Sequence, residues 1–269
     1  MNKLKTILLI GSTGYIGKSL KKILKEDYKL ICPLRKYGFD ITNYKKLDKL
    51  FKKNIDIVIN LSGQNSSIAN MKKTIIKGNQ NIIKILKKQK KPIIYYISTT
   101  LVYGYSPRFV SETSTAKPIS NYAKFKYKGE NLLKKSNLNY KILRLSNVYS
   151  IKKNNFINNL LKSKKKSQKL FVNNLNSYRN YIHLDDVVMI INKILHLNLK
   201  HKIYNIGHEN FTTRQIIEKI SKKINIKLEY LDKRINLRLD SSQKLKKCKL
   251  YNEIKLYPKL SFNKFLDKN

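Results

Sequence analysis

Near its N-terminus the chain carries an apolar run that breaks into three glycines, Thr6-Ile-Leu-Leu-Ile-Gly-Ser-Thr-Gly-Tyr-Ile-Gly-Lys18. This pattern predicts a buried strand, a tight turn and the first residues of a helix. Gly11, Gly14 and Gly17 fall where such a turn needs a sharp bend, close approach to a phosphate, and close packing of helix on strand. The amides that begin this helix would form an anion-binding site.

Apolar strands and amphipathic helices alternate after this turn. Strands are predicted at 28–34, 55–61, 93–98 and 139–145, and helices at 43–53, 71–88 and 121–135. This rhythm predicts an α/β fold, a Rossmann-type doubly wound parallel sheet. We assign residues 1–147 to this NAD(P)-binding domain and residues 148–269 to a smaller C-terminal substrate-binding lobe. The helix at 185–197, capped by Asp185 or Asp186, is expected to pack back on the first domain.

Ligands of such sheets lie beyond the carboxyl ends of the strands. The end of the second strand normally meets the adenosine ribose, where an acid binds the 2′-hydroxyl of NAD and a base accommodates the 2′-phosphate of NADP. This chain has Arg35 and Lys36 there, and its first acid is Asp40. The residues therefore favour NADP(H), with NAD(H) as the open alternative.

The chain is strongly basic, with 58 Lys and Arg against 16 Asp and Glu and a formal net charge of +42. Such a charge ordinarily suggests a nucleic acid or an anionic membrane as partner. The bases are nearly all Lys, however, with seven Arg, and the chain has three Ala, which is typical of AT-rich coding. We interpret the charge as coding bias and expect no specific nucleic-acid partner.

The two cysteines, Cys32 and Cys248, lie in no Cys-x-x-Cys pattern, and the four histidines lie apart from them. Neither a disulfide framework nor a metal site is indicated. The apolar N-terminal run is too short for a signal peptide, and no apolar stretch approaches the ~20 residues of a membrane span. The sequence thus predicts a cytoplasmic protein with no membrane span.

A phenol and an ammonium lie four residues apart in Tyr122-Ala-Lys-Phe-Lys126, on one face of a predicted helix. A lysine cation favours the phenolate of a nearby tyrosine, which makes that tyrosine a usable proton donor or acceptor. With 18 Tyr in so basic a chain the pair arises easily by chance. Its position distinguishes it, because it follows a Ser/Thr cluster at the tip of the 93–98 strand by 23 residues.

Several motifs occur together in a fixed order. They are Gly11-x-x-Gly14-x-x-Gly17, Ile97-Ser-Thr-Thr-Leu-Val-Tyr-Gly104, Tyr122-x-x-x-Lys126, Arg144-Leu-Ser-Asn-Val-Tyr149, Arg179-Asn-Tyr-Ile-His-Leu-Asp-Asp186, Tyr204-Asn-Ile-Gly207 and Leu239-Asp-Ser-Ser242. In order and spacing the chain resembles the extended short-chain dehydrogenase/reductases, the NAD-dependent epimerase/dehydratase family. The resemblance covers nearly the whole chain.

The resemblance implies roles for individual residues. Thr99 would orient the reacting group, Tyr122 would be the general acid/base, and Lys126 would hold the nicotinamide ribose and tune Tyr122. The cofactor would be bound by Gly11, Thr13, Gly14, Tyr15, Ile16, Gly17, Arg35, Asp40, Ile41, Leu61, Ser62, Gly63 and Lys126. Asn147 and Arg179 would face a nucleotide-diphosphate sugar, with Arg179 on its diphosphate. By residue type alone, Asn147 could cap a helix and Arg179 could be a surface base.

The residues in which this chain departs from the family pattern narrow the set of reactions that we expect. Family 4,6-dehydratases have an Asp-Glu pair directly after the active-site Thr, whereas this chain has Thr100-Leu101, which argues against dehydration. The chain is also short in its C-terminal part, as compact 4-keto-reductases often are. We therefore expect an NAD(P)-dependent oxidoreductase that reduces a 4-keto-deoxysugar carried on a nucleotide, in polysaccharide biosynthesis. The alternatives are a 4-epimerase with tightly bound NAD, and a non-catalytic cofactor-binding regulator or scaffold. A homodimer is an open expectation.

Overall fold

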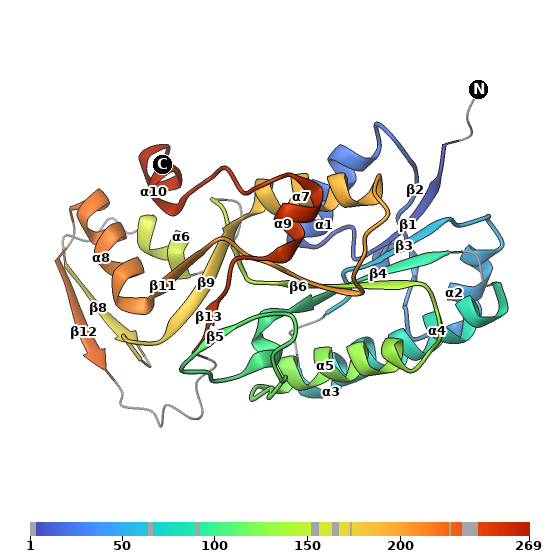
Figure 1. Ribbon diagram of the computed structural model, residues 1–269, viewed down its shortest axis with the longest axis horizontal. Coiled ribbons are helices and arrows are strands. Elements are labelled where there is room, and N and C mark those ends of the chain that lie inside the picture. The colour runs from blue at the N-terminus through green and yellow to red at the C-terminus, as the bar shows by residue number, and fades with distance from the viewer. Residues whose placement is uncertain are drawn as a thin grey trace.

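The computed structural model describes residues 4–63, 67–89, 92–151, 156–162, 167–172, 174–225, 227–232 and 242–269. A parallel sheet of six strands forms its centre, in the order β10-β6-β4-β3-β1-β2 (Figure 1). The strands are β1 (Thr6–Ile10), β2 (Lys29–Ile31), β3 (Ile57–Asn60), β4 (Ile93–Thr99), β6 (Tyr140–Leu145) and β10 (Ile203–Ile206). The chain leaves β1 toward β2 and then returns to β3 on the other side. The predicted α/β, doubly wound parallel sheet is thus confirmed.

Helices cover both faces of this sheet (Figure 1). One face carries α1 (Tyr15–Leu24), α7 (Leu184–Leu195) and α9 (Lys249–Ile254), and the other carries α2 (Tyr44–Phe51), α4 (Gly78–Gln89) and α5 (Asn121–Lys134). Because the central strands β1, β3 and β4 are buried on both faces, they read as nearly continuous apolar runs, whereas the edge strand β2 is partly exposed. A hydrophobic cluster lies between the sheet and the helices on each face. One cluster contains the fully buried Leu20 of α1 and Val187 of α7, and the other contains Leu47 of α2, Ile82 of α4 and Leu133 of α5.

The segment after residue 147 contributes to this central unit as well as to the lobe. β10 pairs with β6, from Ile203 opposite Ile142 to Ile206 opposite Leu145, so it is an edge strand of the main sheet. The helix α7 packs against α1. The C-terminal part of the chain therefore crosses back over the sheet before it completes the lobe.

The lobe holds the remaining elements (Figure 1). Its three-stranded sheet places β9 (Tyr178–His183) between β7 (Asn147–Tyr149) and β11 (Glu209–Thr212). The other elements are α6 (Phe156–Leu161), β8 (Ser167–Val172), α8 (Thr213–Ile224), β12 (Lys227–Asp232) and α10 (Phe262–Asp267), while β5 (Phe109–Val110) pairs with β13 (Lys244–Leu245). Of the motif at 239–242, only Ser242 lies within the described residues, where its Oγ accepts a hydrogen bond from the amide of Tyr178 at 2.9 Å.

The structure differs from the sequence prediction at several boundaries. β2 ends at Ile31 instead of residue 34, since Pro33 offers no amide to a sheet ladder. The predicted 71–88 helix is α3 (Ile68–Lys72), a π-helical turn η2 (Lys73–Lys77) and α4. The predicted cap of α7 was wrong: His183 is the cap and its Nδ1 accepts from the amide of Asp185 at 3.2 Å. Asp186 instead accepts from the amides of residues 259 and 260.

None of the helices in the described ranges has the length and apolar character that a bilayer crossing requires.

Candidate active site

Two hollows open beside the carboxyl ends of the central strands. The first has a volume of about 250 Å³ and lies between the ends of β1 and β3. The second has a volume of about 360 Å³ and is lined from the ends of β1, β4 and β6 and from α5. Their shared lining residues are Gly11, Gly14, Leu61 and Gly63, so the two hollows meet at the glycine turn.

The glycine turn is built as the sequence predicts. Gly11 has φ +86°, a left-handed conformation that favours glycine, and a Cβ on Gly17 would overlap the carbonyl oxygen of Gly11. The amide of Gly14 donates to that same oxygen at 3.0 Å, and Gly14 caps α1 without a side-chain hydrogen bond. The turn therefore brings α1 close to β1 and leaves the first helical amides without a side-chain partner.

The first hollow collects most residues predicted for the adenosine side of a dinucleotide. Gly11, Thr13, Gly14, Arg35, Ile41, Leu61, Ser62 and Gly63 all line it. Asp40 does not: its Oδ1 accepts from the amide of Thr42 at 2.8 Å. Burial opposes the charge of Asp40, but hydrogen bonds from Thr42 and the nearby Arg35 and Lys73 cations outweigh it and lower the pKa. Asp40 thus shapes the turn that presents Ile41.

The second hollow brings together Thr99, Tyr122 and Lys126. Thr99 ends β4 and its Oγ1 accepts from the amide of Leu101 at 3.2 Å, which leaves the hydroxyl proton available to the hollow. Tyr122 and Lys126 lie one turn apart on α5, whose cap Ser120 accepts from the amide of Ala123. Tyr15, Ile16, Gly17 and Asn147 line the same hollow. Tyr15 donates to Ser150 Oγ at 2.8 Å.

Lys126 is held by backbone carbonyls. Its Nζ donates to the carbonyl oxygens of Ser62 at 2.8 Å and Ile97 at 2.7 Å, and it lies 5.9 Å from the centre of the Tyr122 ring. Burial lowers the pKa of Lys126 to about 7, against the opposing charge of Glu130. Burial also raises the pKa of Tyr122 to about 12. The shift of Tyr122 is opposite in direction to the one expected from its lysine neighbour, so the phenol is protonated at neutral pH.

The two residues predicted for the substrate lie on neighbouring strands of the lobe. Asn147 begins β7 and its Nδ2 donates to the carbonyl oxygen of Asn180 at 3.0 Å, so it joins β7 to β9 and does not cap a helix. Arg179 lies on β9, two residues before Tyr181, which is the register partner of Asn147. Its Nη1 donates to Ser177 Oγ at 2.6 Å. Arg179 is half-buried and does not line either hollow.

Reasoning from the sequence missed several lining residues. They are Ile10, Pro33, Phe39 and Thr74 in the first hollow, and Ile97, Ser98, Leu101, Leu145, Ser146 and Val148 in the second. Leu145 and Ser146 follow directly from the rule that ligands lie beyond the carboxyl ends of strands, because β6 ends at Leu145. Thr74 and Phe39 carry no such signal, since both lie outside the strands.

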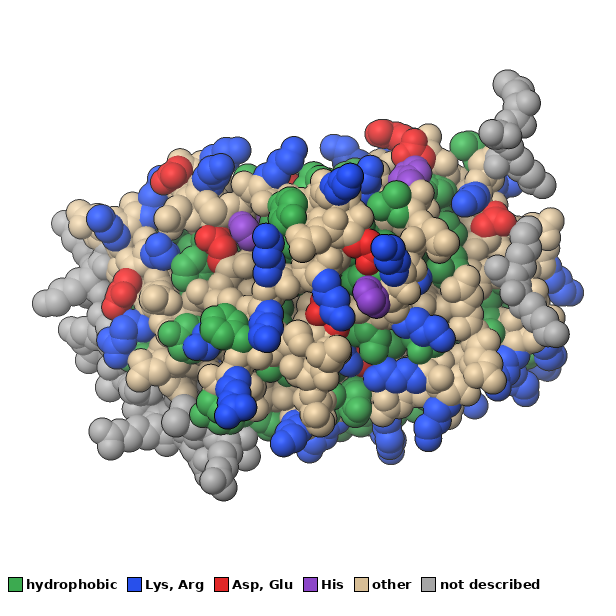
Figure 2. All heavy atoms as spheres, viewed as in Figure 1, with side chains coloured by type: hydrophobic (Ala, Val, Ile, Leu, Met, Phe, Trp, Pro, Cys, Tyr) green, Lys and Arg blue, Asp and Glu red, His purple; other side chains and the backbone are tan. Residues whose placement is uncertain are grey.

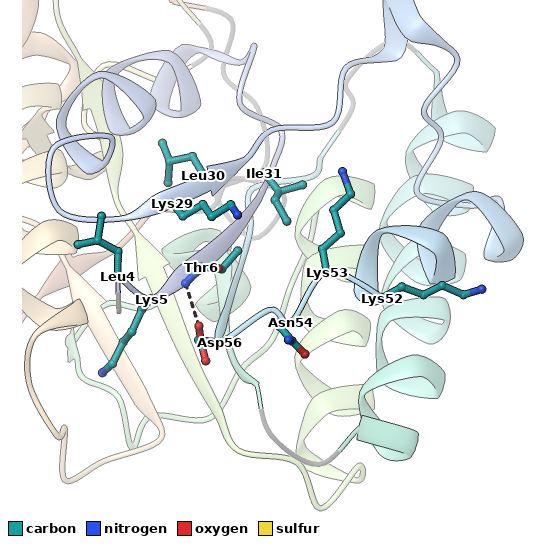
Figure 3. A pocket seen from close by; sticks show the side chains of 10 residues that line it. All are labelled: Leu4, Lys5, Thr6, Lys29, Leu30, Ile31, Lys52, Lys53, Asn54 and Asp56. Carbon is teal, nitrogen blue, oxygen red and sulfur yellow. Dashed lines mark hydrogen bonds between the residues drawn. The ribbon is translucent and has the colours of Figure 1, made fainter. Parts of the chain in front are cut away.

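A third hollow of about 1200 Å³ lies at the opposite, amino-terminal edge of the sheet (Figure 3). It is lined from the first residues of β1 and β2 and from the loop before β3, and Lys5, Lys29, Lys52 and Lys53 surround it. Its one carboxylate, Asp56, accepts from the amide of Thr6 at 2.8 Å. None of the predicted site residues lines this hollow.

The residues at the carboxyl edge fit a nicotinamide dinucleotide. The glycine turn leaves the first amides of α1 without a side-chain cap, and Arg35 offers a cation beside Ile41 in the first hollow. Ser62 and Ser146 line the two hollows, and their buried hydroxyls have no hydrogen-bond partner among the described residues. Within these residues no cluster of three or more His, Cys, Asp or Glu side chains could hold a metal.

The fold and site define a class of protein. A doubly wound sheet with a glycine turn after β1, and with Thr, Tyr and Lys side chains converging at the ends of β4 and α5, is the architecture of a Rossmann-type dinucleotide enzyme. Residues 7–207 match the model of the NAD dependent epimerase/dehydratase family, and the chain belongs to this family. It is an enzyme of the short-chain dehydrogenase/reductase type, as the motifs predicted.

Named relatives share this architecture. The chain is 27% identical over 239 residues to a putative UDP-glucose 4-epimerase of Methanocaldococcus jannaschii, covering 75% of this chain and 76% of that protein. It is 25% identical to the GDP-6-deoxy-D-talose 4-dehydrogenase of Aggregatibacter actinomycetemcomitans, covering 80% of each. The crystal structure of dTDP-glucose 4,6-dehydratase from Bacillus anthracis in complex with NAD superposes with a TM-score of 0.82 at 22% identity, covering 98% of this chain and 94% of that one.

Proposed function

We propose that this enzyme reduces the 4-keto group of a nucleotide-diphosphate deoxysugar, with a nicotinamide dinucleotide as the electron donor. The observation that carries the proposal is geometric: the phenol of Tyr122 lines the same hollow as the Thr99 hydroxyl, and burial raises the pKa of that phenol. Reduction of a ketone needs one proton at the oxygen that becomes the new hydroxyl. A half-buried phenol with a raised pKa keeps its proton at neutral pH and is suited to supply it.

In this mechanism the bound cofactor supplies a hydride to C4. Thr99 donates a hydrogen bond to the C4 oxygen and orients it, and Tyr122 transfers its phenolic proton to that oxygen. The carbonyl oxygens of Ser62 and Ile97 hold the Nζ atom of Lys126 beside the same hollow. The ketone thus gains one hydride and one proton and becomes the secondary alcohol.

The lining of the second hollow argues against a dehydration. Its titratable side chains are Tyr15, Tyr122 and Lys126, and no carboxylate, imidazole or thiol is among the lining residues. Water elimination requires a further acid and base beside the sugar, and Leu101 lies in the hollow where dehydratases of the family have an acid. A reaction with a single proton transfer suits this lining.

The second candidate is 4-epimerisation, which the similarity to the putative UDP-glucose 4-epimerase favours. Both reactions use Tyr122 in the same place. They differ in whether the cofactor is consumed, because a reductase uses one reduced cofactor for each sugar and an epimerase uses none.

The test is to mix the purified protein with reduced cofactor and a nucleotide-linked 4-keto-6-deoxyhexose and to follow cofactor absorbance. We expect stoichiometric oxidation of the cofactor, and a loss of about 10²–10⁴-fold in rate for Tyr122→Phe. Tyr127→Phe, on the same helix but outside both hollows, is the matched control and should react as the wild type does. Interconversion of UDP-hexoses without added cofactor would establish the epimerase instead. Equal turnover by Tyr122→Phe would reject both mechanisms.

A further inference from the structure

A buried ionic cluster lies under the catalytic helix α5. Glu130 is fully buried, and its Oε1 accepts from Ser98 Oγ at 2.6 Å and from Arg144 Nε at 3.0 Å. Its Oε2 accepts from Arg144 Nη2 at 2.6 Å, so the carboxylate and the guanidinium form a bidentate salt bridge. Ser98 and Arg144 are register partners on β4 and β6. The cluster therefore joins one helix to two adjacent strands.

The cluster is directly behind the reacting groups. Ser98 precedes Thr99 in β4, and Glu130 lies one helical turn after Lys126 and two turns after Tyr122. Because i and i+4 positions share a helix face, Glu130 continues the line formed by Tyr122 and Lys126. Because Glu130 is bonded to β4 and β6, it fixes the position of α5 along these strands. It thereby fixes where Tyr122 and Lys126 lie relative to Thr99.

The cluster extends to the loop that follows Thr99. Arg144 Nη1 donates to the hydroxyl of Tyr103 at 2.9 Å, and that hydroxyl donates to Asn205 Oδ1 at 2.8 Å. Tyr103 ends the 3₁₀ turn η3 (Thr100–Tyr103), which begins one residue after Thr99. The chain of bonds therefore ties the residues after Thr99 to α5 and to the edge strand β10.

The charge of Glu130 also acts on Lys126. Lys126 is surrounded by groups from several elements. Tyr122 and Glu130 lie on the same helix α5, and the Tyr96 ring lies 5.0 Å away on β4. The carbonyl oxygens of Ser62 and Ile97 accept from its Nζ, and Arg144 of β6 lies behind Glu130. Glu130 is the acid of this set, and its negative charge stabilises the buried ammonium. Losing that charge would favour the neutral amine.

A buried ion pair is weak evidence for stability, because its desolvation offsets much of its attraction and an apolar pair of similar size is often as stable. We propose that Glu130 is a positioning residue: with Arg144 and Ser98 it sets α5 against the carboxyl ends of β4 and β6, and its charge keeps Lys126 as an ammonium beside the hollow that Tyr122 and Thr99 line. The experiment has two arms. The first measures turnover and rests on the proposed function, and the second measures cofactor binding alone.

The first arm measures turnover of Glu130→Gln, which keeps the shape of the side chain and removes its charge. We expect kcat to fall by about 10²-fold, because misplacing a catalytic group by 1 Å costs that much, with KM for the sugar changed little. Lys126 loses its proton as pH rises, so activity that needs the ammonium declines on the alkaline side. In Glu130→Gln this decline should begin about 1–3 pH units lower than in the wild type.

The second arm measures the dissociation constant of NADH against pH by its fluorescence, which needs no sugar. The Glu130→Gln variant should lose affinity at lower pH than the wild type, and Lys126→Met should bind weakly at every pH. If the wild type binds NADH but reduces no sugar, the proposed function fails while this arm still decides the role of Glu130.

Matched variants separate positioning from stability. Glu253→Gln removes another structural acid, whose carboxylate accepts from the amide of Lys200 and the hydroxyl of Tyr204 outside both hollows. It should lower the melting temperature without moving either pH profile.

Glu130→Asp restores the charge and should recover the alkaline limb of the pH profile. If Glu130→Gln does not fold, Tyr103→Phe, which removes the hydroxyl that accepts from Arg144 and lies outside both hollows, should still lower kcat by about 10-fold. A lower melting temperature with unchanged kcat and unchanged pH profiles in these variants would overturn the proposal.

Discussion

At the scale of single residues, burial decides the ionisation of the catalytic pair. Tyr122 and Lys126 are both enclosed by α5 and β4, and burial favours the neutral form of each. It raises the pKa of Tyr122 to about 12 and lowers that of Lys126 to about 7. The neutral phenol is a proton donor, which suits the reductive direction, and Lys126 keeps its ammonium form most firmly below neutral pH.

Arg35 carries the prediction that the cofactor is NADP(H). It begins the 3₁₀ turn η1 (Arg35–Tyr37) and lines the first hollow. The solved dehydratase that superposes on this chain binds NAD, so the similarity gives no support to this preference. A single cation on a 2′-phosphate contributes about 1.5–3 kcal/mol through a charged hydrogen bond. The preference therefore depends on one side chain and can be measured directly.

We predict that Arg35→Ala weakens NADPH binding by roughly 10- to 100-fold and changes NADH binding little, because only the former carries the 2′-phosphate. Titrations of cofactor fluorescence give both dissociation constants. Lys36→Ala is the control, since Lys36 does not line the hollow and lies over the Tyr37 ring. A wild type that binds NADH more tightly than NADPH would reject the preference for NADP(H).

At the scale of elements, α5 is the part on which the site depends. Tyr122, Lys126 and Glu130 all project from it, and Gly129 lets it approach β4 closely. A Cβ on Gly129 would overlap the hydroxyl of Tyr96, which itself lies 3.4 Å from the Lys126 carbonyl oxygen. The glycine costs α5 about 1 kcal/mol of helix propensity, but it lets the helix lie near enough to β4 for Glu130 to accept a hydrogen bond from Ser98.

Gly129→Ala is expected to destabilise the protein in spite of the better helix propensity of alanine. The gain of about 1 kcal/mol is smaller than the ~1–3 kcal/mol cost of overpacking a closed core. Denaturant unfolding measures the difference. Adding Tyr96→Phe removes the overlapping hydroxyl and should recover part of the loss in a double-mutant cycle.

Lys128→Ala, at an exposed position of the same helix, is the control and should change the free energy of unfolding by less than about 0.5 kcal/mol. A Gly129→Ala variant as stable as the wild type would show that α5 can move away from β4 without cost.

At the scale of the whole molecule, the net charge is strongly positive, and on the face seen in Figure 2 this charge is spread instead of gathered. Lysine and arginine side chains cover the face seen in Figure 2 at many points, with acidic side chains between them. A nucleic-acid site would be expected to concentrate its cations along one groove or face. The dispersed pattern agrees with coding bias as the origin of the net charge of +42.

We predict that the protein binds single-stranded RNA at low salt without sequence preference, and that this binding weakens by about 10³-fold or more between 50 and 200 mM salt. Fluorescence anisotropy with two unrelated oligonucleotides measures both properties. Cofactor binding, which relies on a closed hollow, should change far less over the same range. Selective binding of one oligonucleotide that survives high salt would point to a functional polyanion surface.

The fold was predictable to a large extent, and its failures have physical causes. Hydrophobic periodicity located the strands of the central sheet, because alternation with helices is a local signal. It did not predict that residues 203–206 join the same sheet as residues 6–10, nor that His183 would cap α7 in place of an aspartate. The pairing of residues 203–206 depends on a strand about 60 residues earlier in the chain, whereas the His183 cap is a local bond to the amide of Asp185.

The site was predictable wherever a motif marks a residue by its spacing. The glycine turn, Thr99, Tyr122, Lys126 and Asn147 line the hollows at the carboxyl edge, whereas Asp40 and Arg179 do not. The roles of all these residues stay predictions until they are measured. The sequence motifs placed Asp40 and Arg179 in the site. Their side chains instead form local hydrogen bonds with Thr42 and Ser177, and these bonds set where the side chains point.

The sequence by itself determined the fold class, the family and the set of candidate catalytic residues, because periodicity and motif spacing are properties of neighbouring residues. Only the tertiary structure decided the direction in which the pKa values of Tyr122 and Lys126 are shifted, and the ionic cluster of Glu130, Arg144 and Ser98 beneath them. Burial and tertiary pairing fix these features, because they arise only when α5 is packed against β4, which precedes it, and β6, which follows it.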